Sequence, residues 1–397
     1  MKVAVVGAGL AGLAAADALA RAGVEVVVLE ARERVGGRVW SQPFAGGVAE
    51  RGAEFVFASD EVLQATAERL GLRLFRKGTL YGAREPRGGE PVTTAEVEAA
   101  AAELRSLAPH GSVADALGAS KIAPAAREAI QARIEISSAH PADDLDAAVL
   151  AETGAGFGRF DTYGVEGGNS GLARGLATRL AVHVGSPVEA VVWGERSVRL
   201  QGDGFEVDAD RAVLAAPAKA VERIRFDPPL PAAAALALAG VRYGQAAKLH
   251  VPLLSRVEPS AILAVADRYW SYTQLGPDGL PAGFAGTFAG TPAALERLRV
   301  GDGPERWLEG LAELRPELDL EPGEAMLTIW GDDPWSLGAY SAPSLSSPLQ
   351  TDELVRPVGP FVFAGEHTAG EWHGLMEGAL RSGLRAAADL TRASTPP

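Results

Sequence analysis

The sequence predicts an α/β protein with two domains. The chain has 397 residues, a length that suits two domains better than one. Its first thirty residues have the pattern of a strand, a glycine turn, a helix and a second strand. The segment that begins at Phe361 repeats the order of strand, glycine-rich turn and helix. We therefore expect a Rossmann-like dinucleotide-binding domain that contains both of these segments, together with an α+β domain.

The first glycine turn, residues 7–12, lies between an apolar strand and an Ala-rich helix. Gly7 allows the turn, Gly9 lets backbone amides approach a pyrophosphate, and Gly12 lets the helix pack closely on the strand. Glu30 closes the following strand, where its carboxylate can accept hydrogen bonds from a ribose diol. The four residues predict a dinucleotide site, and the acid disfavours NADP because it would repel the 2′-phosphate.

A small helical layer is predicted between residues 93 and 150, where the sequence is Ala-rich with helical periodicity. It begins with a capping box, in which Thr93 is the N-cap and the Glu96 side chain reaches back to it.

Strands dominate the middle of the chain. Residues 184–200 and 205–216 alternate in hydrophobicity, and the proline-rich segment after Asp227 ends this pattern, so we place a domain crossing there. Residues 243–330 mix short strands with an amphipathic helix that starts near residue 293. The predicted dinucleotide-binding domain comprises residues 1–75, 166–226 and 335–397, and the predicted substrate domain comprises residues 76–165 and 227–334.

Composition excludes several classes of chemistry. The chain has no cysteine, which excludes disulfides, a cysteine nucleophile and a cofactor tethered through cysteine sulfur. A formal net charge of −14 disfavours nucleic acid and anionic membrane surfaces as partners. The six histidines have neither the spacing nor the clustering of a metal site, so no metal is expected. The chain opens directly into a strand and has no membrane-spanning apolar run, so we expect it to be cytoplasmic.

The segment after Glu30 distinguishes FAD from NAD. It adds cations and a second glycine turn, where the longer ribityl and phosphate chain of a flavin would need them. In this segment the chain resembles the flavin amine-oxidase family, which includes monoamine, polyamine and putrescine oxidases and L-amino-acid oxidases. The resemblance implies that FAD is held by Glu30, Arg32, Gly37 and Arg38.

The resemblance continues along nearly the whole chain. It includes a segment expected beneath the flavin, a glycine turn back into the FAD domain, a cofactor-side strand and a C-terminal flavin-contacting block; these are residues 52–55, 167–169, 213–217, and 363–368 with 376–379. The implied fold is the two-domain FAD-dependent amine-oxidase fold. The further cofactor-binding residues that it implies are Ala53, Glu54, Val188, Ala216, Trp330, Gly365, Glu366 and Met376.

Lys248 is the first candidate catalytic residue. It lies in an apolar, strand-like run of a chain that has 32 arginines and only 5 lysines. Taken alone, this pattern also fits a structural lysine whose apolar stem is buried. The family resemblance implies instead that Lys248 holds a water against the flavin N(5) and assists the reaction with oxygen.

Tyr340 is the second candidate catalytic residue, because its segment resembles the one that ends in an aromatic wall facing the flavin. Monoamine oxidases carry a flavin-bonded cysteine just before this tyrosine, and Ala339 stands there in this chain, so FAD is expected to be bound non-covalently. Leu375 occupies the position of a second aromatic ring, which leaves the expected cage half aromatic. Together with Phe55 and Trp372, these two side chains are the predicted substrate-binding residues.

The resemblance implies an FAD-dependent amine oxidase. It would transfer a hydride from the α carbon of an amine to flavin N(5) and yield an imine, then aldehyde and ammonia, with hydrogen peroxide. The expected partners are a small-molecule amine and oxygen, and a homodimer is one assembly compatible with the sequence.

The closest alternative is an L-amino-acid oxidase, for which Arg84, Arg87 or Arg242 could bind the substrate carboxylate. A renalase-like dihydronicotinamide oxidase is a more distant alternative, which Lys248 and the Tyr340 wall disfavour. An NAD-linked dehydrogenase is disfavoured by the second glycine turn, and a non-catalytic flavoprotein stays open.

Overall fold

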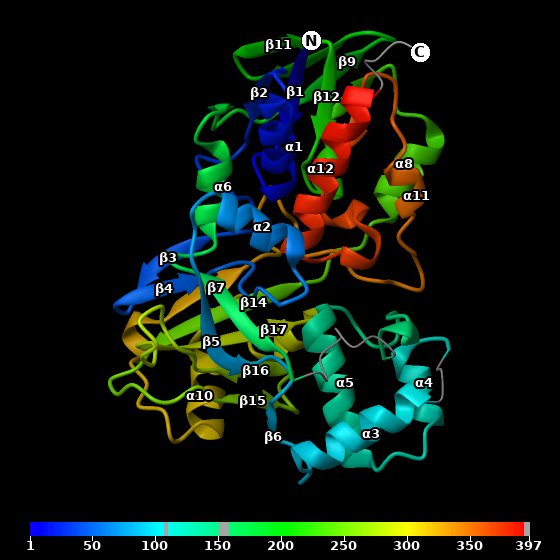
Figure 1. Ribbon diagram of the computed structural model, residues 1–397. Helices are drawn as coiled ribbons and strands as arrows, with labels where there is room; N and C mark the ends of the chain where they lie inside the picture. The colour runs from blue at the N-terminus through cyan, green and yellow to red at the C-terminus, as the bar shows by residue number, and fades with distance from the viewer. Residues whose placement is uncertain (107–109, 151–158, 393–397) are drawn as a thin grey trace.

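The computed structural model describes residues 1–106, 110–150 and 159–392, which form two lobes, one above the other in Figure 1. The first lobe, which holds the N-terminus, contains a five-stranded parallel sheet. In spatial order its strands are β19 (Phe361–Phe363), β12 (Arg211–Leu214), β1 (Lys2–Val6), β2 (Glu25–Leu29) and β8 (Ala181–His183). Segments from the start, the middle and the end of the chain meet in one sheet, which confirms the predicted α/β class.

Both faces of this sheet are covered, because successive side chains of β1 point to opposite faces. Val3 and Val5 pack against helices α1 (Leu10–Arg21), α2 (Glu61–Arg69), α6 (Ser170–Ala177) and α12 (Met376–Arg392). Ala4 and Val6 pack on the opposite face. The elements there are β9 (Ala190–Trp193), β10 (Val198–Gly202), β11 (Phe205–Ala209), β13 (Arg225–Asp227), α7 (Ala218–Val221), α8 (Ala232–Gly240) and α11 (Thr351–Leu354).

Helix α8 packs in the first lobe, whereas the predicted domain division assigned residues 227–334 to the second domain. Its buried Ala237 and Leu238, and Tyr243 after it, belong to the same apolar cluster as Phe361 of β19. Burial of these side chains against the first sheet outweighs the turn signal of the proline-rich segment. The packing therefore places the crossing between lobes near Gly244, after α8.

The second lobe is built on a six-stranded sheet. In spatial order its strands are β18 (Met326–Ile329), β14 (Ala246–Pro252), β17 (Phe284–Gly290), β16 (Tyr269–Tyr272), β15 (Ala261–Ala264) and β6 (Glu85–Arg87). One face packs against α9 (Pro292–Arg297) and α10 (Glu305–Leu314), near the 3₁₀ turn η3 (Pro322–Glu324). The other face packs against the predicted helical layer, which comprises α3 (Thr94–Ser106), α4 (Val113–Ala119), α5 (Pro124–Ser138) and the 3₁₀ turn η1 (Ala147–Leu150).

The predicted capping box is present at the start of α3. The Thr93 backbone N–H donates to the Glu96 carboxylate at 2.8 Å, and the Glu96 N–H donates to the Thr93 hydroxyl at 3.3 Å. Two of the N–H groups at the start of the helix therefore gain acceptors.

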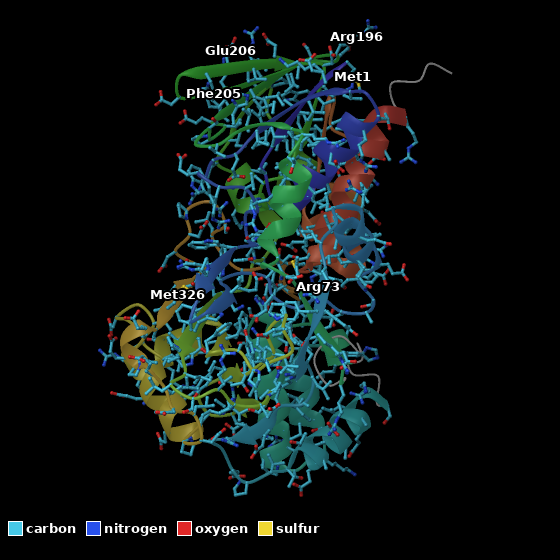
Figure 2. All side chains as sticks on the ribbon, turned by 60° about the vertical axis from the view of Figure 1, so that its left-hand side comes forward. Met1, Arg73, Arg196, Phe205, Glu206 and Met326 are labelled. Atoms are coloured by element: carbon cyan, nitrogen blue, oxygen red, sulfur yellow. The ribbon has the colours of Figure 1, made fainter. Side chains whose placement is uncertain are left out.

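Two short antiparallel pairs lie between the lobes. They are β3 (Ser41–Phe44) with β4 (Gly47–Glu50), and β5 (Leu74–Leu80) with β7 (Asp161–Val165). Figure 2 shows Arg73, at the start of β5, midway between the β9–β11 end of the first lobe and the lower part of the second. Arg73 pairs with Glu166 at 2.6 Å, next to the β5–β7 ladder. In the part of the chain that the structure describes, no helix has both the length and the apolar character needed to cross a membrane.

Candidate active site

Two adjoining cavities lie where the lobes meet. The first cavity, of about 390 Å³, extends from the glycine turn to the C-terminal block. The second cavity, of about 330 Å³, is lined by residues of the second lobe and by part of the C-terminal block. Eight residues line both cavities and form what we call the shared wall: Gly52, Ala53, Lys248, Phe288, Tyr340, Gly374, Leu375 and Met376. The two cavities therefore adjoin at this wall, where a molecule in one can contact a molecule in the other.

The glycine turn forms one end of the first cavity. Gly7 has a φ of +100°, which favours glycine, and a Cβ on Gly12 would lie 1.9 Å from the Gly7 carbonyl oxygen. Gly9 is the N-cap of α1, and nothing lies within 4 Å of the place a Cβ would take. The turn thus presents the unpaired N–H groups of the helix N-terminus to open space, as binding of a pyrophosphate requires.

Glu30 lies beside this turn, almost fully buried, with its carboxylate tied to the backbone. It accepts hydrogen bonds from the N–H of Ala8 at 2.7 Å and of Arg32 at 2.9 Å. The acid is therefore fixed at the end of β2 before any ligand is present, which suits a ribose-binding role.

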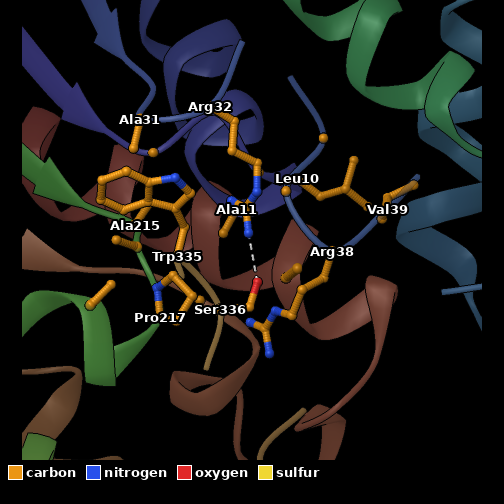
Figure 3. Close-up of a pocket in the computed structure, with 18 of the residues that line it drawn as sticks. Leu10, Ala11, Ala31, Arg32, Arg38, Val39, Ala215, Pro217, Trp335 and Ser336 are labelled. Carbon is orange, nitrogen blue, oxygen red and sulfur yellow. Dashed lines mark hydrogen bonds between the residues drawn. The ribbon is translucent and has the colours of Figure 1, made fainter. Parts of the chain in front are cut away.

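Arg32 lines the same cavity from the loop after Glu30. Its Nη2 donates to Asp333 Oδ1 at 2.5 Å and to Ser336 Oγ at 2.7 Å, and Figure 3 shows the bond to Ser336 together with the neighbouring Trp335. Trp335 and Ser336 line this cavity but were not singled out in the sequence, because neither belongs to a glycine motif.

Arg38 and Glu366 link the two ends of the chain at the first cavity. Arg38 Nη1 donates to Glu366 Oε1 at 2.8 Å and to the carbonyl oxygen of Ala339 at 2.7 Å. Burial alone would raise the pKa of Glu366, but the Arg38 guanidinium and neighbouring hydrogen-bond donors lower that pKa to about 2. The pair therefore carries both charges at neutral pH and fixes the backbone just before Tyr340.

Strand β14 directs Lys248 towards the shared wall. Ala247, Leu249 and Val251 belong to the apolar cluster on the α10 side of the sheet, so Lys248, between them in the alternation, points to the other side. There its Nζ donates to the carbonyl oxygens of Glu50 at 2.6 Å and Gly52 at 3.1 Å.

The remaining donor of Lys248 bonds Glu54 Oε2 at 2.5 Å. Lys77 bonds the other carboxylate oxygen at 3.0 Å, and the Tyr272 hydroxyl also donates to Oε2. We call these four residues the Glu54 network; their side chains are nearly fully buried. Burial alone would raise the pKa of Glu54, but the ammonium groups of Lys248 and Lys77 hold it well below its usual range.

Aromatic rings dominate the second cavity. Phe55 lies edge-on to Trp270 and Tyr272 with ring centroids 5.4 Å apart, and Tyr81 lies 5.5 Å from Trp270. The Tyr340 hydroxyl donates to the carbonyl oxygen of Ser137 at 2.8 Å, and burial raises the pKa of Tyr340, so this ring stays neutral. Such a lining suits the apolar part of a substrate.

Most of the predicted site residues line the first cavity. Those residues are Gly7, Gly9, Glu30, Arg32, Gly37, Arg38, Ala53, Val188, Ala216, Lys248, Trp330, Tyr340, Gly365, Glu366, Leu375 and Met376. Gly12 supports the turn without lining the cavity, while Glu54 and Phe55 line only the second cavity.

Trp372 lines neither cavity, and the Arg381 guanidinium lies 4.5 Å from its ring centroid. Its position therefore offers no support for the predicted role in substrate binding. Among the three arginines considered for a carboxylate, Arg84 lines the second cavity, whereas Arg87 and Arg242 line neither. Phe288, on the shared wall, carries no sequence signal apart from its place in a strand.

Known proteins resemble this chain over most of its length. The family model for flavin containing amine oxidoreductases matches residues 10–161 and 148–391. Putrescine oxidase from Kocuria rosea is 28% identical over 99% of this chain and 95% of its own length. L-amino-acid oxidase from Bothrops atrox is 26% identical over 99% of this chain and 89% of its own length. Wild-type putrescine oxidase bound to putrescine has a similar structure, with a TM-score of 0.81 at 25% identity, over 99% of both chains.

The match begins at Leu10, inside the glycine turn, includes Glu30, the shared wall and the C-terminal block, and spans most of the chain. The residues of the first cavity fit FAD, since the turn is open to a pyrophosphate and the acid is placed for a ribose. The chain belongs to the flavin-containing amine oxidase family.

Proposed function

We propose that this FAD-dependent enzyme oxidises an amine at its α carbon and uses oxygen as the final electron acceptor. The amine would become an imine, which water converts to aldehyde and ammonia, and oxygen would be reduced to hydrogen peroxide. The observation that carries the proposal is the shared wall, where the cavity suited to FAD meets an aromatic cavity across Lys248 and Tyr340. Amine and cofactor can meet at this wall.

When bound, FAD supplies the hydride acceptor of the reaction. The residues of the chain supply position and a dry environment. Tyr340 and Phe288 present their rings at the shared wall and can orient a neutral amine, while Tyr340 is itself held by Ser137. Since Tyr340 stays protonated and Lys248 is engaged with Glu54, neither offers a strong base, and the amine has to react in its neutral form.

Lys248 is proposed to hold a water at this wall and to assist the step with oxygen. Its three donors have acceptors at Glu50, Gly52 and Glu54, so holding a water requires one of the two carbonyl contacts to be exchanged. The longer contact, to Gly52 at 3.1 Å, is the weaker of the two and lies on the shared wall.

An absorption spectrum with anaerobic addition of amines tests this function. We expect the bands of oxidised flavin to bleach with an amine and to return, with peroxide, when air is admitted. A yellow protein that no primary amine, diamine, polyamine or amino acid bleaches would contradict the amine chemistry and leave the FAD site intact. A protein that does not take up FAD would contradict both.

Gly9→Ala is expected to weaken FAD binding by about tenfold to hundredfold, since a methyl group placed in the cradle competes with the pyrophosphate. The apoprotein should unfold at the same temperature as the wild type, because Gly9 has a φ of −73° and a ψ of 176°, which alanine also adopts. FAD titration and thermal unfolding of the apoprotein measure the two effects.

Gly118→Ala is the matched control, since Gly118 lies exposed on α4 and an added Cβ also meets nothing within 4 Å. It should leave FAD binding unchanged. Wild-type affinity in Gly9→Ala would show that the cradle does not hold the pyrophosphate.

A further inference from the structure

Arg84 lies in the second cavity and is not one of the residues of the shared wall. It lines the second cavity and not the first, and it is 5% exposed. Its guanidinium carbon is 3.5 Å from the ring centroid of Trp270 and 4.9 Å from that of Tyr81. A fixed cation therefore forms part of an otherwise aromatic lining.

This guanidinium has spare hydrogen-bonding capacity. Arg84 Nε donates to the Tyr81 carbonyl oxygen at 3.2 Å, while Nη1 is buried with no hydrogen-bond partner. Within the described ranges, no carboxylate pairs with it in an ion pair. Burial lowers the pKa of Arg84 to about 10, so the group is still cationic at neutral pH. A buried cation without a counter-charge is costly, and a bound anion would remove that cost.

The position of Arg84 sets how far an anion would lie from the reacting amine. Lys248 is part of the shared wall, and Glu54 accepts hydrogen bonds from both Lys248 and the Tyr272 hydroxyl. The Tyr272 ring lies 4.6 Å from the Trp270 ring, and Arg84 stacks on Trp270. Along these contacts the Tyr272–Trp270 pair lies between Arg84 and Lys248, whereas the carboxylate of an α-amino acid is one bond from the carbon that reacts.

We propose that the second cavity takes an amine whose other end is a carboxylate, bound by Arg84, with the amine at the shared wall. This inference rests on the proposed amine oxidation and names its substrate class as ω-amino acids. The carboxylate would accept hydrogen bonds from Arg84 in the fork geometry that guanidinium and carboxylate groups share.

The charges around the cavity also disfavour a diamine. A second ammonium group would approach the guanidinium of Arg84, which lines this cavity. Glu54 is already paired with Lys248 and Lys77, and Glu371 is exposed where it lines this cavity. An acid at the exposed side can attract an incoming amine, but the interior favours a negative end group. The chain would then differ in substrate from the putrescine oxidase that it resembles.

The wild-type holoenzyme tests the proposal with three series of equal chain length: ω-amino acids, diamines and alkylamines, from four to eight carbons. We expect kcat/KM for the best ω-amino acid to exceed that of its alkylamine by about tenfold or more and that of its diamine by more. L-Norleucine tests the α-amino acid alternative. A preference for diamines, for alkylamines or for L-norleucine would overturn the proposal and leave amine oxidation standing; if nothing in any series bleaches the flavin, amine oxidation itself fails.

Arg84→Gln should raise KM for the ω-amino acid by about tenfold to hundredfold, leave kcat nearly unchanged and erase the preference over the alkylamine. Arg84→Lys, which keeps the charge, should restore part of the preference. Arg87→Gln is the matched control, because Arg87 pairs with Glu85 and Glu317 outside both cavities. Equal loss for the acid and the alkylamine in Arg84→Gln would mean a structural role only and would overturn the assignment.

Discussion

Lys248→Met is expected to retain FAD and to slow the reaction of the reduced enzyme with oxygen by at least about 10²-fold. The substitution removes the ammonium group that lines both cavities and keeps the apolar stem of the side chain. Anaerobic reduction by the amine should change less, because orientation by Tyr340 and Phe288 is retained. Stopped-flow absorbance, with each half-reaction followed separately, measures the two rates.

Lys77→Met is a close control for this experiment. Lys77 pairs with the same carboxylate as Lys248, at 3.0 Å, and is as deeply buried, yet it lines neither cavity. Both variants should therefore lose comparable stability, while only Lys248→Met should lose the oxygen step. An oxygen reaction that is slowed equally in both variants would assign the effect to the Glu54 network as a whole and not to Lys248.

The parts of the site that sequence predicted depend on contacts within short segments. Gly7, Gly12 and Glu30 meet through one turn and two adjacent strands, so their spacing alone indicates the cradle. The same holds for the capping box of Thr93 and Glu96, whose hydrogen bonds span three residues. Element type followed from hydrophobic periodicity for β1, α1, β2 and the helical layer, whereas the one helix expected from residue 293 is divided into α9 and α10.

The rest could not be predicted, because it depends on how distant segments pack. Lys77, Glu54 and Lys248 are far apart in the sequence, and the burial that makes their charges costly arises only when β5 and β14 close over residues 50–54. The sequence does not distinguish Arg84 from Arg87 and Arg242 as a carboxylate-binding residue. The contact of Arg84 with Trp270 of β16 forms only in the folded chain. A sequence motif also indicates the course of the backbone but not the direction of each side chain. Trp372 is an example, because its ring lies against Arg381 and lines neither cavity.

Glu54→Gln is expected to destabilise the holoenzyme by about 3–5 kcal/mol at neutral pH, because it leaves two buried ammonium groups without their carboxylate. The wild-type side chains are 3% exposed at Glu54, 3% at Lys77 and 5% at Lys248, so water cannot replace the lost charge. Urea unfolding at fixed FAD concentration, followed by tryptophan fluorescence, measures the change. An unfolding midpoint equal to that of the wild type would contradict the charge assignment of the Glu54 network.

The pH dependence separates this electrostatic effect from simple loss of packing. In the wild type the pKa of Glu54 is held below its usual range, so its contribution is fully present above the unfolded pKa of about 4.5 and is lost as pH falls below it. The variant lacks this contribution at every pH, so its deficit should shrink on acidification. Adding Lys77→Met to Glu54→Gln should restore part of the stability at pH 7. Only the Lys248 ammonium group then remains, and its carbonyl acceptors at Glu50 and Gly52 are intact. A deficit that stays constant with pH and grows in the double variant would assign the loss to packing instead.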